Sequence, residues 1–440
     1  MVNNNKSLIA RVDSGVFLLY LTLVIIGIIS IFSVEYSSND PMMYSLSKSF
    51  MKQSIFFGVS LFIGLIILFT DSKVFNSFAY LAYTIGLFLL IITIFIGKDI
   101  KGSHSWLSLG GFTFQPGEVC KIFTALALTK YLSSPEVNFQ ILKDRLIGIA
   151  IAMIPAFIIV LQDETGLALV YFSFFLVLYK EGLPNSIVIV GISLVVLTLG
   201  TMILPGYVIT ISLVVIGVII GYFLQKEFKR NWNVRLAFIG IFILCMLYTQ
   251  VAVPTIFKHV LKGYQKERIY SMLGMEIPEA FMELNEDGEY IKKTDPDYNV
   301  RQSKIAIGSG GFLGKGFLNG TSTKNDFVPE QSTDFIFCSI GEQFGFVGSF
   351  LLIAVYLALL LRILKLAERQ RSKFNSLYAY CVSAIIFFHV AINLSMTIGL
   401  APVIGITLPF ISYGGSSLVS FSVLLFILLR LDADRQVLIR

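Results

Sequence analysis

The sequence predicts an all-α polytopic membrane protein with about twelve transmembrane helices and one large extracytoplasmic loop. Of its 440 residues, 55% are hydrophobic and only 14% are charged, whereas soluble domains usually carry about 25% charged residues. Many apolar runs approach the roughly 20 residues that a helix needs to cross the hydrocarbon core. The formal net charge of +6 fits Lys and Arg in cytoplasmic loops, so we expect the surface to contact membrane lipids and no nucleic acid.

Apolar stretches account for the predicted helices in chain order. They lie near residues 15–34, 54–70, 77–97, 115–133, 145–161, 166–181, 184–203, 207–224, 236–256, 343–364, 377–399 and 410–429. Between 184–203 and 207–224 the only break is Leu204-Pro205-Gly206, which fits either a kink in one long element or a tight hairpin. We expect the hairpin, because about forty apolar residues exceed one crossing.

The spans divide the chain into three predicted parts. An N-terminal membrane bundle, residues 1–256, is followed by a large extracytoplasmic loop, residues 257–342, and by a C-terminal membrane bundle, residues 343–440. The first apolar run is too long for the core of a cleavable signal peptide, so we expect it to remain as a span.

Lys and Arg are distributed unequally between the two sides of this arrangement. With the N-terminus inside, the short cytoplasmic segments hold most of them, and the short outer loops hold Lys48, Lys52, Lys98 and Lys101. The positive-inside rule therefore predicts that both termini are cytoplasmic.

Four chemically unusual segments fall on the outer side in this orientation. They are the stretch 102–118, which contains Gly and Trp, the acidic stretch 162–166, the loop 257–342 and the Gly-, Pro- and Ser-rich stretch 399–417. Chance would distribute four such segments over both faces of the membrane. We therefore expect one shared extracytoplasmic site.

The stretch 102–118 leads into a predicted helix that carries an ionisable pair. Pro116 suits the first turn of a helix, and Glu118 and Lys121 are three residues apart, so they share a helix face. Ionisable groups at membrane depth are costly and normally face a bundle interior or a wet cavity. The pair is therefore either a structural ion pair or part of the lining of an outer cavity.

Glu164, with Asp163 beside it, lies at the junction of two predicted spans. Such a carboxylate belongs either to a solvated turn between helices or to a site, where it would orient a polar substrate or a Lys side chain. The sequence alone leaves both readings open.

The loop 257–342 is the only long polar segment, and loops longer than about 15 residues are usually functional or disordered. Its mixture of Gly turns and apolar residues predicts that it folds down onto the bundle. Lys304, Lys315 and Arg268 are basic residues in it that could contact a phosphate. Its Gly-rich run lacks the Gly-Lys-Ser/Thr ending of a nucleotide-binding loop.

Together these segments resemble the SEDS (RodA/FtsW) family of cell-wall synthases, in order and over most of the chain. The long motif from Gln302 is closer to the RodA branch than to the FtsW branch. The similar runs are Gly102-Ser-His-Ser-Trp106-Leu, Gln115-Pro116-x-Glu118-x-x-Lys121, Gln302-Ser-Lys-Ile-Ala-Ile-Gly-Ser-Gly-Gly, Gly314-Lys-Gly, Pro329-Glu330-x-x-Thr333-Asp334-Phe-Ile-Phe and Leu408-Pro409-Phe-Ile-Ser412-Tyr-Gly-Gly-Ser416.

The resemblance implies a peptidoglycan glycosyltransferase of the bacterial cytoplasmic (inner) membrane. Its reaction would polymerise lipid II into β-1,4 glycan strands during cell elongation, by an inverting displacement with undecaprenyl diphosphate as the leaving group. Its implied partners are a class B penicillin-binding protein, which is a transpeptidase, and the nascent glycan strand. The implied substrate-binding residues are Trp106, Gln115, Glu118, Lys121, Glu164, Gln302, Ser303, Lys304, Glu330, Asp334, Ser412 and Ser416.

Among the departures of the chain from the family pattern, two bear on the fold and the mechanism. The family usually has ten spans, so we expect a ten-helix core plus an extra hairpin near 184–224. The family's catalytic aspartate follows an Arg by six residues and precedes a Pro, but counting from Arg268 gives Gly274. Glu276, two residues further on, and Asp295, which keeps the following Pro, remain alternative candidates for the general base.

A metal requirement and a rival function stay open at the level of sequence. Lys and Arg, or a divalent cation such as Mg²⁺ or Mn²⁺, would stabilise the leaving diphosphate. The four cysteines lack metal-binding spacing, and we interpret them as packing residues. The rivals are a transporter (flippase) of the lipid-linked precursor and an inactive scaffold. The one-sided distribution of polar motifs favours the enzyme, because a transporter lines a path to both faces.

Overall fold

The computed structural model describes residues 11–36, 45–100, 103–109, 112–261, 263–272, 298–325 and 327–436. The chain forms two compact units. The first comprises the residues up to Leu183 together with those from Asn299 onward, and the second extends from Pro184 to Tyr298.

Helices dominate both units, as the sequence predicts, and the chain is a multi-pass membrane protein. Within the described ranges, ten helices are long and apolar enough to cross a membrane. They are α2 (Ser14–Glu35), α3 (Ser49–Phe69), α5 (Ala79–Ile96), α7 (Leu142–Leu161), α10 (Asn185–Ile203), α11 (Gly206–Arg230), the helical stretch Trp232–His259 that begins with α12 (Trp232–Leu247), α17 (Ile336–Arg369), α18 (Lys373–Thr397) and α19 (Gly415–Ala433).

Two further predicted spans are also helical. α6 (Pro116–Ser133) carries three charged side chains, those of Glu118, Lys121 and Lys130, and the apolar stretch Thr165–Lys180 is shorter than the ten. A total of twelve crossings therefore stays a prediction. The remaining helices are α4 (Ser72–Ser77), α8 (Thr165–Val170), α9 (Phe174–Lys180), α13 (Val253–Thr255), α14 (Gly263–Met272), α15 (Tyr298–Ser309) and α16 (Thr321–Lys324).

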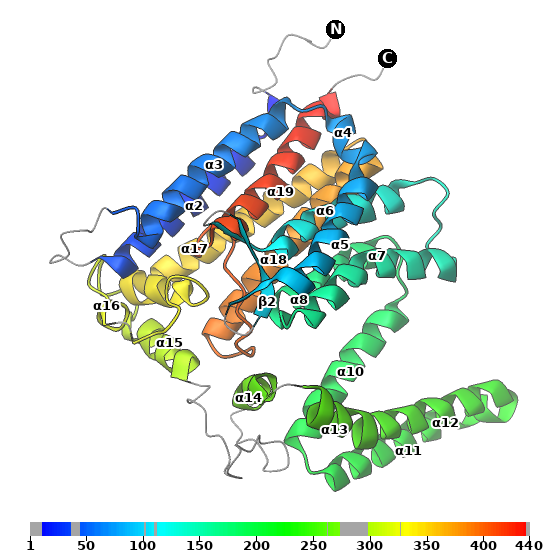
Figure 1. Ribbon diagram of the computed structural model, residues 1–440. Helices are drawn as coiled ribbons and strands as arrows, with labels where there is room; N and C mark the ends of the chain where they lie inside the picture. The colour runs from blue at the N-terminus through cyan, green and yellow to red at the C-terminus, as the bar shows by residue number, and fades with distance from the viewer. Residues whose placement is uncertain are drawn as a thin grey trace. The chain divides into compact units, whose positions relative to one another are not determined.

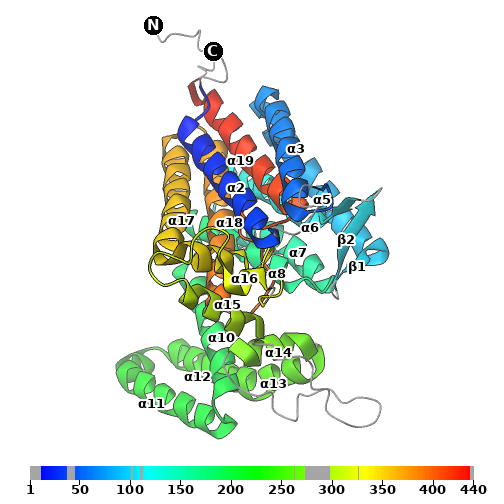
Figure 2. The ribbon, with the colours of Figure 1, turned by 90° about the vertical axis from the view of Figure 1, so that its left-hand side faces the viewer.

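α18 and α19 form the centre of the first unit. Their most apolar windows are 67% and 83% buried, whereas that of the peripheral α5 is 22% buried. α19 packs against α3, α6 and α18 (Figures 1 and 2). Gly64 of α3 makes one of these approaches close, since a Cβ at this position would lie 2.5 Å from the ring of Phe426.

The predicted break at residues 204–206 separates two helices in the second unit. α10 ends at Ile203 and α11 begins at Gly206. α11 then packs mainly along α12 rather than folding back on α10 (Figure 1). This pairing follows from the short turn at Asn231, whose side chain caps α12 by accepting a hydrogen bond from the N–H of Asn233. The break itself is as predicted, but the tight hairpin expected between 184–203 and 207–224 is not what the structure shows, because α11 pairs with α12 instead of α10.

A three-stranded antiparallel sheet adds to the helical fold an element that the sequence analysis did not predict. It consists of β1 (Lys98–Ile100), β2 (Ser103–Leu109) and β3 (Phe112–Phe114), in the order β1-β2-β3. β2 lies against α5 and the start of α6 (Figure 2). Its buried side chains, Ser103 and Ser105, alternate along the chain, as expected for a strand with one packed face.

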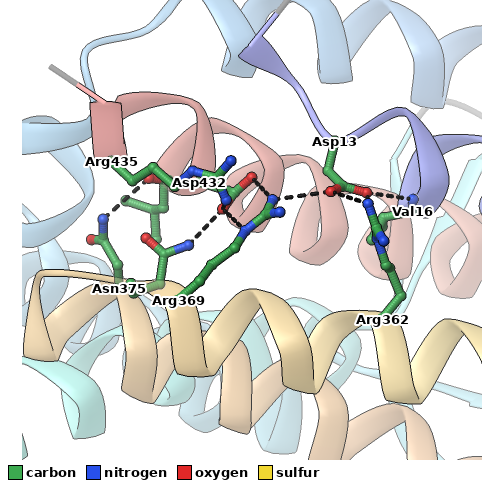
Figure 3. Close-up of polar contacts among 9 residues, drawn as sticks. Asp13, Val16, Arg362, Arg369, Asn375, Asp432 and Arg435 are labelled. Carbon is green, nitrogen blue, oxygen red and sulfur yellow. Dashed lines mark hydrogen bonds and ion pairs between the residues drawn. The ribbon is translucent and has the colours of Figure 1, made fainter.

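A network of ion pairs joins the ends of α2, α17 and α19 (Figure 3). Asp13 caps α2 by accepting from the N–H of Val16, and its carboxylate also pairs with Arg362 at 2.9 Å and Arg369 at 3.0 Å. Arg369 pairs with Asp432 at 2.5 Å. Burial raises the pKa of the Asp13 carboxyl, but the hydrogen bonds and positive charges lower it by more, so this pKa lies below its ordinary value of 3.8.

Candidate active site

The predicted ionisable pair lies inside the first unit, at the beginning of α6. Pro116 occupies the first turn, and the Nζ of Lys121 donates to Oε2 of Glu118 over 2.5 Å. Both residues are buried, with relative exposures of 0% for Lys121 and 5% for Glu118. The i, i+3 spacing therefore brings the two charges together, as the sequence predicts.

α18 and α19 enclose this pair. The Nε2 of His389 on α18 lies 3.4 Å from the Nζ of Lys121, and the same Nζ lies 3.8 Å from the centre of the Phe421 ring on α19. Ser420, also on α19, donates its hydroxyl to the backbone carbonyl of Glu118. Charges removed from water in this way need partners, and here an anion, an imidazole and an aromatic face surround the ammonium.

A second polar cluster links the first outer motif to the acidic junction. Oε2 of Glu164 accepts from the hydroxyl of Ser105 over 3.0 Å, and the side-chain amide of Gln115 lies 3.5 Å from the same hydroxyl. Gln162, in the same acidic stretch as Glu164, is fixed to α5 by a hydrogen bond to the carbonyl of Leu90. The structure thus brings Gln115 and Glu164 together, and the half-buried Trp106 follows Ser105 on β2.

The C-terminal motif and two parts of the large loop meet at the end of α18. Ser303 of α15 donates its hydroxyl to the carbonyl of Thr397, and the side-chain amide of Asn393 donates to the carbonyl of Asp334. The hydroxyl of Ser412 donates to the carbonyl of Thr333 over 2.6 Å. The Ser303 and Ser412 hydroxyls therefore join segments that lie far apart in the sequence.

The other predicted residues of these segments are more accessible. Gln302 and Ser416 are partly exposed, and Lys304 is exposed beside Gly399, where a Cβ would lie 2.4 Å from its Nζ. Glu330 is exposed, accepts from the hydroxyl of Thr333 over 2.9 Å, and lines a polar cavity of about 500 Å³. These positions are open to a ligand, whereas the buried ones are not.

The Gly-rich run of the large loop completes a broken helix. Gly345, at φ 63° and ψ −155°, interrupts α17, and a helix break leaves backbone groups without intrahelical partners. The loop supplies partners on both sides of the break. Carbonyls of Gly311 and Phe312 accept from the N–H groups of Phe346 and Val347, and N–H groups of Lys315 and Gly316 donate to the carbonyls of Glu342 and Gln343.

Glu342 fixes this loop through its side chain. Its carboxylate accepts from Nζ of Lys315 at 2.7 Å and from the backbone N–H groups of Ser322 and Thr323 at 2.8 and 3.0 Å. Lys315, which the sequence analysis considered for phosphate binding, is therefore engaged in an ion pair within the protein.

The two candidates for the general base, Glu276 and Asp295, lie outside the described residues. Among the residues that the structure describes, no group of three or more His, Cys, Asp or Glu side chains could hold a metal ion.

Comparison with known proteins identifies the family. The model of the FtsW/RodA/SpoVE family, described as "Cell cycle protein", matches residues 13–210 and 209–437. The chain belongs to this family. Among relatives of this FtsW/RodA/SpoVE protein, the peptidoglycan glycosyltransferase RodA of Treponema pallidum is 29% identical, over 92% of the chain and 94% of the relative. The peptidoglycan glycosyltransferase MrdB of Escherichia coli K12 is 30% identical, over 79% of the chain and 75% of the relative.

Solved structures support the assignment of the fold to the FtsW/RodA/SpoVE family. One, from work on the structural coordination of polymerization and crosslinking by a peptidoglycan synthase complex, has a TM-score of 0.67 and 25% identity, and the match covers 97% of this chain and 99% of that one. The crystal structure of Thermus thermophilus RodA has a TM-score of 0.59 and 23% identity, covering 97% and 98%.

Sequence reasoning missed three residues that organise the site of this family member. Glu342 is the last residue of the predicted loop 257–342, and no local pattern in the sequence identifies Lys315 as its partner. His389 and Asn393 carried a usable signal, because two polar side chains four residues apart in an apolar helix share one face. Polar residues within spans normally face the interior of a bundle.

Proposed function

We propose that this chain is a peptidoglycan glycosyltransferase that polymerises lipid II into β-1,4 glycan strands on the outer side of the bacterial cytoplasmic membrane. The observation that carries the proposal is the convergence on α18 of segments distant in sequence. His389 contacts α6, Asn393 contacts the segment around Asp334, and Thr397 contacts α15. The names of the relatives, peptidoglycan glycosyltransferases of the same family, supply the reaction.

The proposed reaction is one inverting displacement. A carboxylate, Glu276 or Asp295, removes the proton from the sugar 4-hydroxyl of the acceptor lipid II. The hydroxyl oxygen then attacks the anomeric carbon of the growing glycan, and the bond to undecaprenyl diphosphate breaks. Negative charge develops on the leaving diphosphate as this bond breaks, so a positively charged group must lie close to it. Lys304, the exposed basic side chain of the run Gln302–Gly311, is suited to this role, with a divalent cation as the alternative.

The buried Lys121 has a different role in this proposal. Its charge is balanced by Glu118 at 2.5 Å and its side chain is fully buried, so it is poorly suited to contact a diphosphate directly. We assign the pair a structural role, in which it fixes the position of α6 next to the residues that contact substrate.

The partner and the orientation are parts of the same proposal. A class B penicillin-binding protein would crosslink the strands, in keeping with the peptidoglycan synthase complex of the solved relative. Both termini would be cytoplasmic, because Lys and Arg are concentrated in the segments on their side of the membrane.

A transporter of the lipid-linked precursor is the second candidate, and one observation favours it. α17 is broken at Gly345, and discontinuous helices are typical of transport sites. The alternative predicts movement of lipid II between leaflets without bond formation.

One experiment separates these functions. The purified chain and its class B partner are incubated with labelled lipid II, and the products are separated by length. A second sample, in proteoliposomes, reports transfer of lipid II between leaflets. Polymer formation supports the glycosyltransferase, whereas transfer without polymer supports the transporter. As a control, the crosslinking activity of the partner is measured on glycan strands that are supplied separately. This activity shows that the preparation is active.

A further inference from the structure

α18 presents a ladder of polar residues at intervals of four. His389, Asn393 and Thr397 are 1%, 0% and 0% exposed, and the spacing places them on one face of the helix. Each contacts a different segment, and none of the three was needed to recognise the motifs. A buried polar ladder of this kind costs stability unless each group is paired, so its arrangement calls for a specific reason.

The contacts of His389 define its protonation. Nδ1 lies 3.3 Å from the carbonyl oxygen of Thr407, which can only accept a hydrogen bond, so Nδ1 carries the proton. Nε2 then has a lone pair directed at the ammonium of Lys121, 3.4 Å away. In the opposite tautomer, the lone pair of Nδ1 would face the Thr407 carbonyl oxygen, and the N–H of Nε2 would face the Lys121 ammonium. In an imidazolium, the cationic Nε2–H would face the cationic ammonium of Lys121. The neutral Nδ1–H form alone satisfies both contacts.

Lys121 is consequently fixed from three directions. Glu118 accepts from it at 2.5 Å, His389 accepts on a second side, and the Phe421 ring lies 3.8 Å away. The imidazole itself packs edge-on against the same ring, with centroids 4.7 Å apart. A free lysine side chain has many rotamers. These contacts restrict the Lys121 side chain to one rotamer and link its ammonium, through His389, to the backbone at Thr407.

Asn393 fixes the neighbouring residue of the same loop. Its side-chain amide donates to the carbonyl of Ile406 over 2.7 Å and to that of Asp334 over 2.9 Å. Both partners are acceptors, so the amide cannot be turned over without losing both bonds. Two successive backbone carbonyls, those of Ile406 and Thr407, are thus held by side chains one turn apart on α18.

We propose that His389 is a positioning residue, which accepts from the Lys121 ammonium and thereby couples the Glu118–Lys121 pair to the loop 404–412. The catalytic consequence of this coupling rests on the proposed function, because the pair and this loop would then support the residues that contact substrate in the polymerase site. His389 acts through Lys121 and Thr407 and touches no substrate.

Two substitutions separate the two bonds of the imidazole. His389→Gln places an amide oxygen near the position of Nε2 and keeps an acceptor for Lys121, whereas His389→Asn places an amide nitrogen near the position of Nδ1 and keeps only the donor to Thr407. Loss of a hydrogen bond to a charged group lowers a rate or equilibrium constant by a factor of about ten to a hundred. We expect His389→Asn to lose about that much polymerisation rate, with rescue in His389→Gln. Equal rates in two variants of equal thermal stability would overturn the proposal.

A second readout does not depend on activity. Unfolding temperatures of His389→Leu, Lys121→Met and the double variant form a cycle that measures the coupling of the two side chains. We expect the double variant to lose less than the sum of the single losses. The control cycle pairs His389→Leu with Lys130→Met, since Lys130 lies on the same helix and instead contacts Ser77 and Tyr80.

The two readouts distinguish the possible failures. Additive losses in the His389–Lys121 cycle would overturn the inferred contact, whatever the chain does to lipid II. Absence of polymer from the wild-type chain together with a coupled cycle would instead refute the proposed function, and with it the catalytic meaning of the contact.

Discussion

The ammonium nitrogen of Lys121 lies 2.5 Å from a carboxylate oxygen of Glu118 within a single turn of α6, and both side chains are buried. Breaking a buried pair by removing one partner costs about 3–5 kcal/mol, whereas replacing both partners by apolar residues is often neutral. We therefore expect Glu118→Ala to lower the unfolding temperature strongly and Glu118→Leu/Lys121→Met to recover most of the loss.

The same variants decide between the two readings of the pair. If the pair shapes the site, the stable double variant will not polymerise lipid II, as measured by product length after normal membrane levels are confirmed. Wild-type polymerisation by that variant would show that the pair only holds the bundle together.

The glycines of the large loop provide a graded test of how the loop is attached to α17. Gly308 has open space around it, Gly311 has a positive φ of 56° and open space, and Gly314 has a φ of 81° with an added Cβ only 2.1 Å from the carbonyl oxygen of Gln343. We expect Gly308→Ala to be neutral or stabilising, Gly311→Ala to cost about 1–2 kcal/mol, and Gly314→Ala to cost more, in unfolding free energy. A loss for Gly308→Ala as large as that for Gly314→Ala would contradict the attachment described.

The carboxylate of Asp13 predicts a pH dependence of stability. A group whose pKa is depressed in the folded state stabilises it above the unfolded pKa, and this contribution disappears as the pH falls through the folded pKa. Asp13→Asn should therefore cost on the order of 2 kcal/mol at pH 7, and its difference from wild type should shrink as the pH falls below 3.8.

Asp71→Asn is a matched control for Asp13→Asn. Asp71 caps the short helix α4 by accepting from the N–H of Lys73 but is absent from the network of Arg362 and Arg369 in Figure 3. Thermal unfolding of both variants between pH 7 and pH 3 checks the prediction, which fails if Asp71→Asn shows the larger pH-dependent loss.

The orientation is tested by fusing a reporter that is active only in the cytoplasm. Fusions after Lys229, Arg371 or Arg440 should give signal, and a fusion within residues 280–295 should give none, because the charge distribution predicts opposite sides for these positions. Signal from the 280–295 fusion would reverse the orientation and remove the shared outer site.

Much of this architecture could be predicted from the sequence because membrane spans leave a strong local signal. The Glu118–Lys121 pair was predictable for the same reason, since a helix converts a spacing of three into contact. The ion pair of Lys315 with Glu342 and the contact of His389 with Lys121 were not, because they depend on how separate helices pack. The strand at Ser103–Leu109 was missed since its alternating pattern is short and follows a long helical region.

The identity of the general base can be tested by two isosteric substitutions. Glu276→Gln and Asp295→Asn preserve the shape of each side chain and remove the base, and a single oriented base contributes about 10²–10⁴-fold. We expect one of the two single variants to lose activity on this scale, with the other near wild type, which would identify the base.

The most direct measurement is polymerisation of labelled lipid II by the purified chain with its class B partner, comparing wild type with the Glu276→Gln/Asp295→Asn double variant at equal membrane levels. We expect long glycan products from wild type and a loss of at least about a hundredfold in the rate of the double variant. Wild-type rates in the double variant would contradict the assigned base, and the absence of polymer from wild type beside an active partner would contradict the proposed function itself.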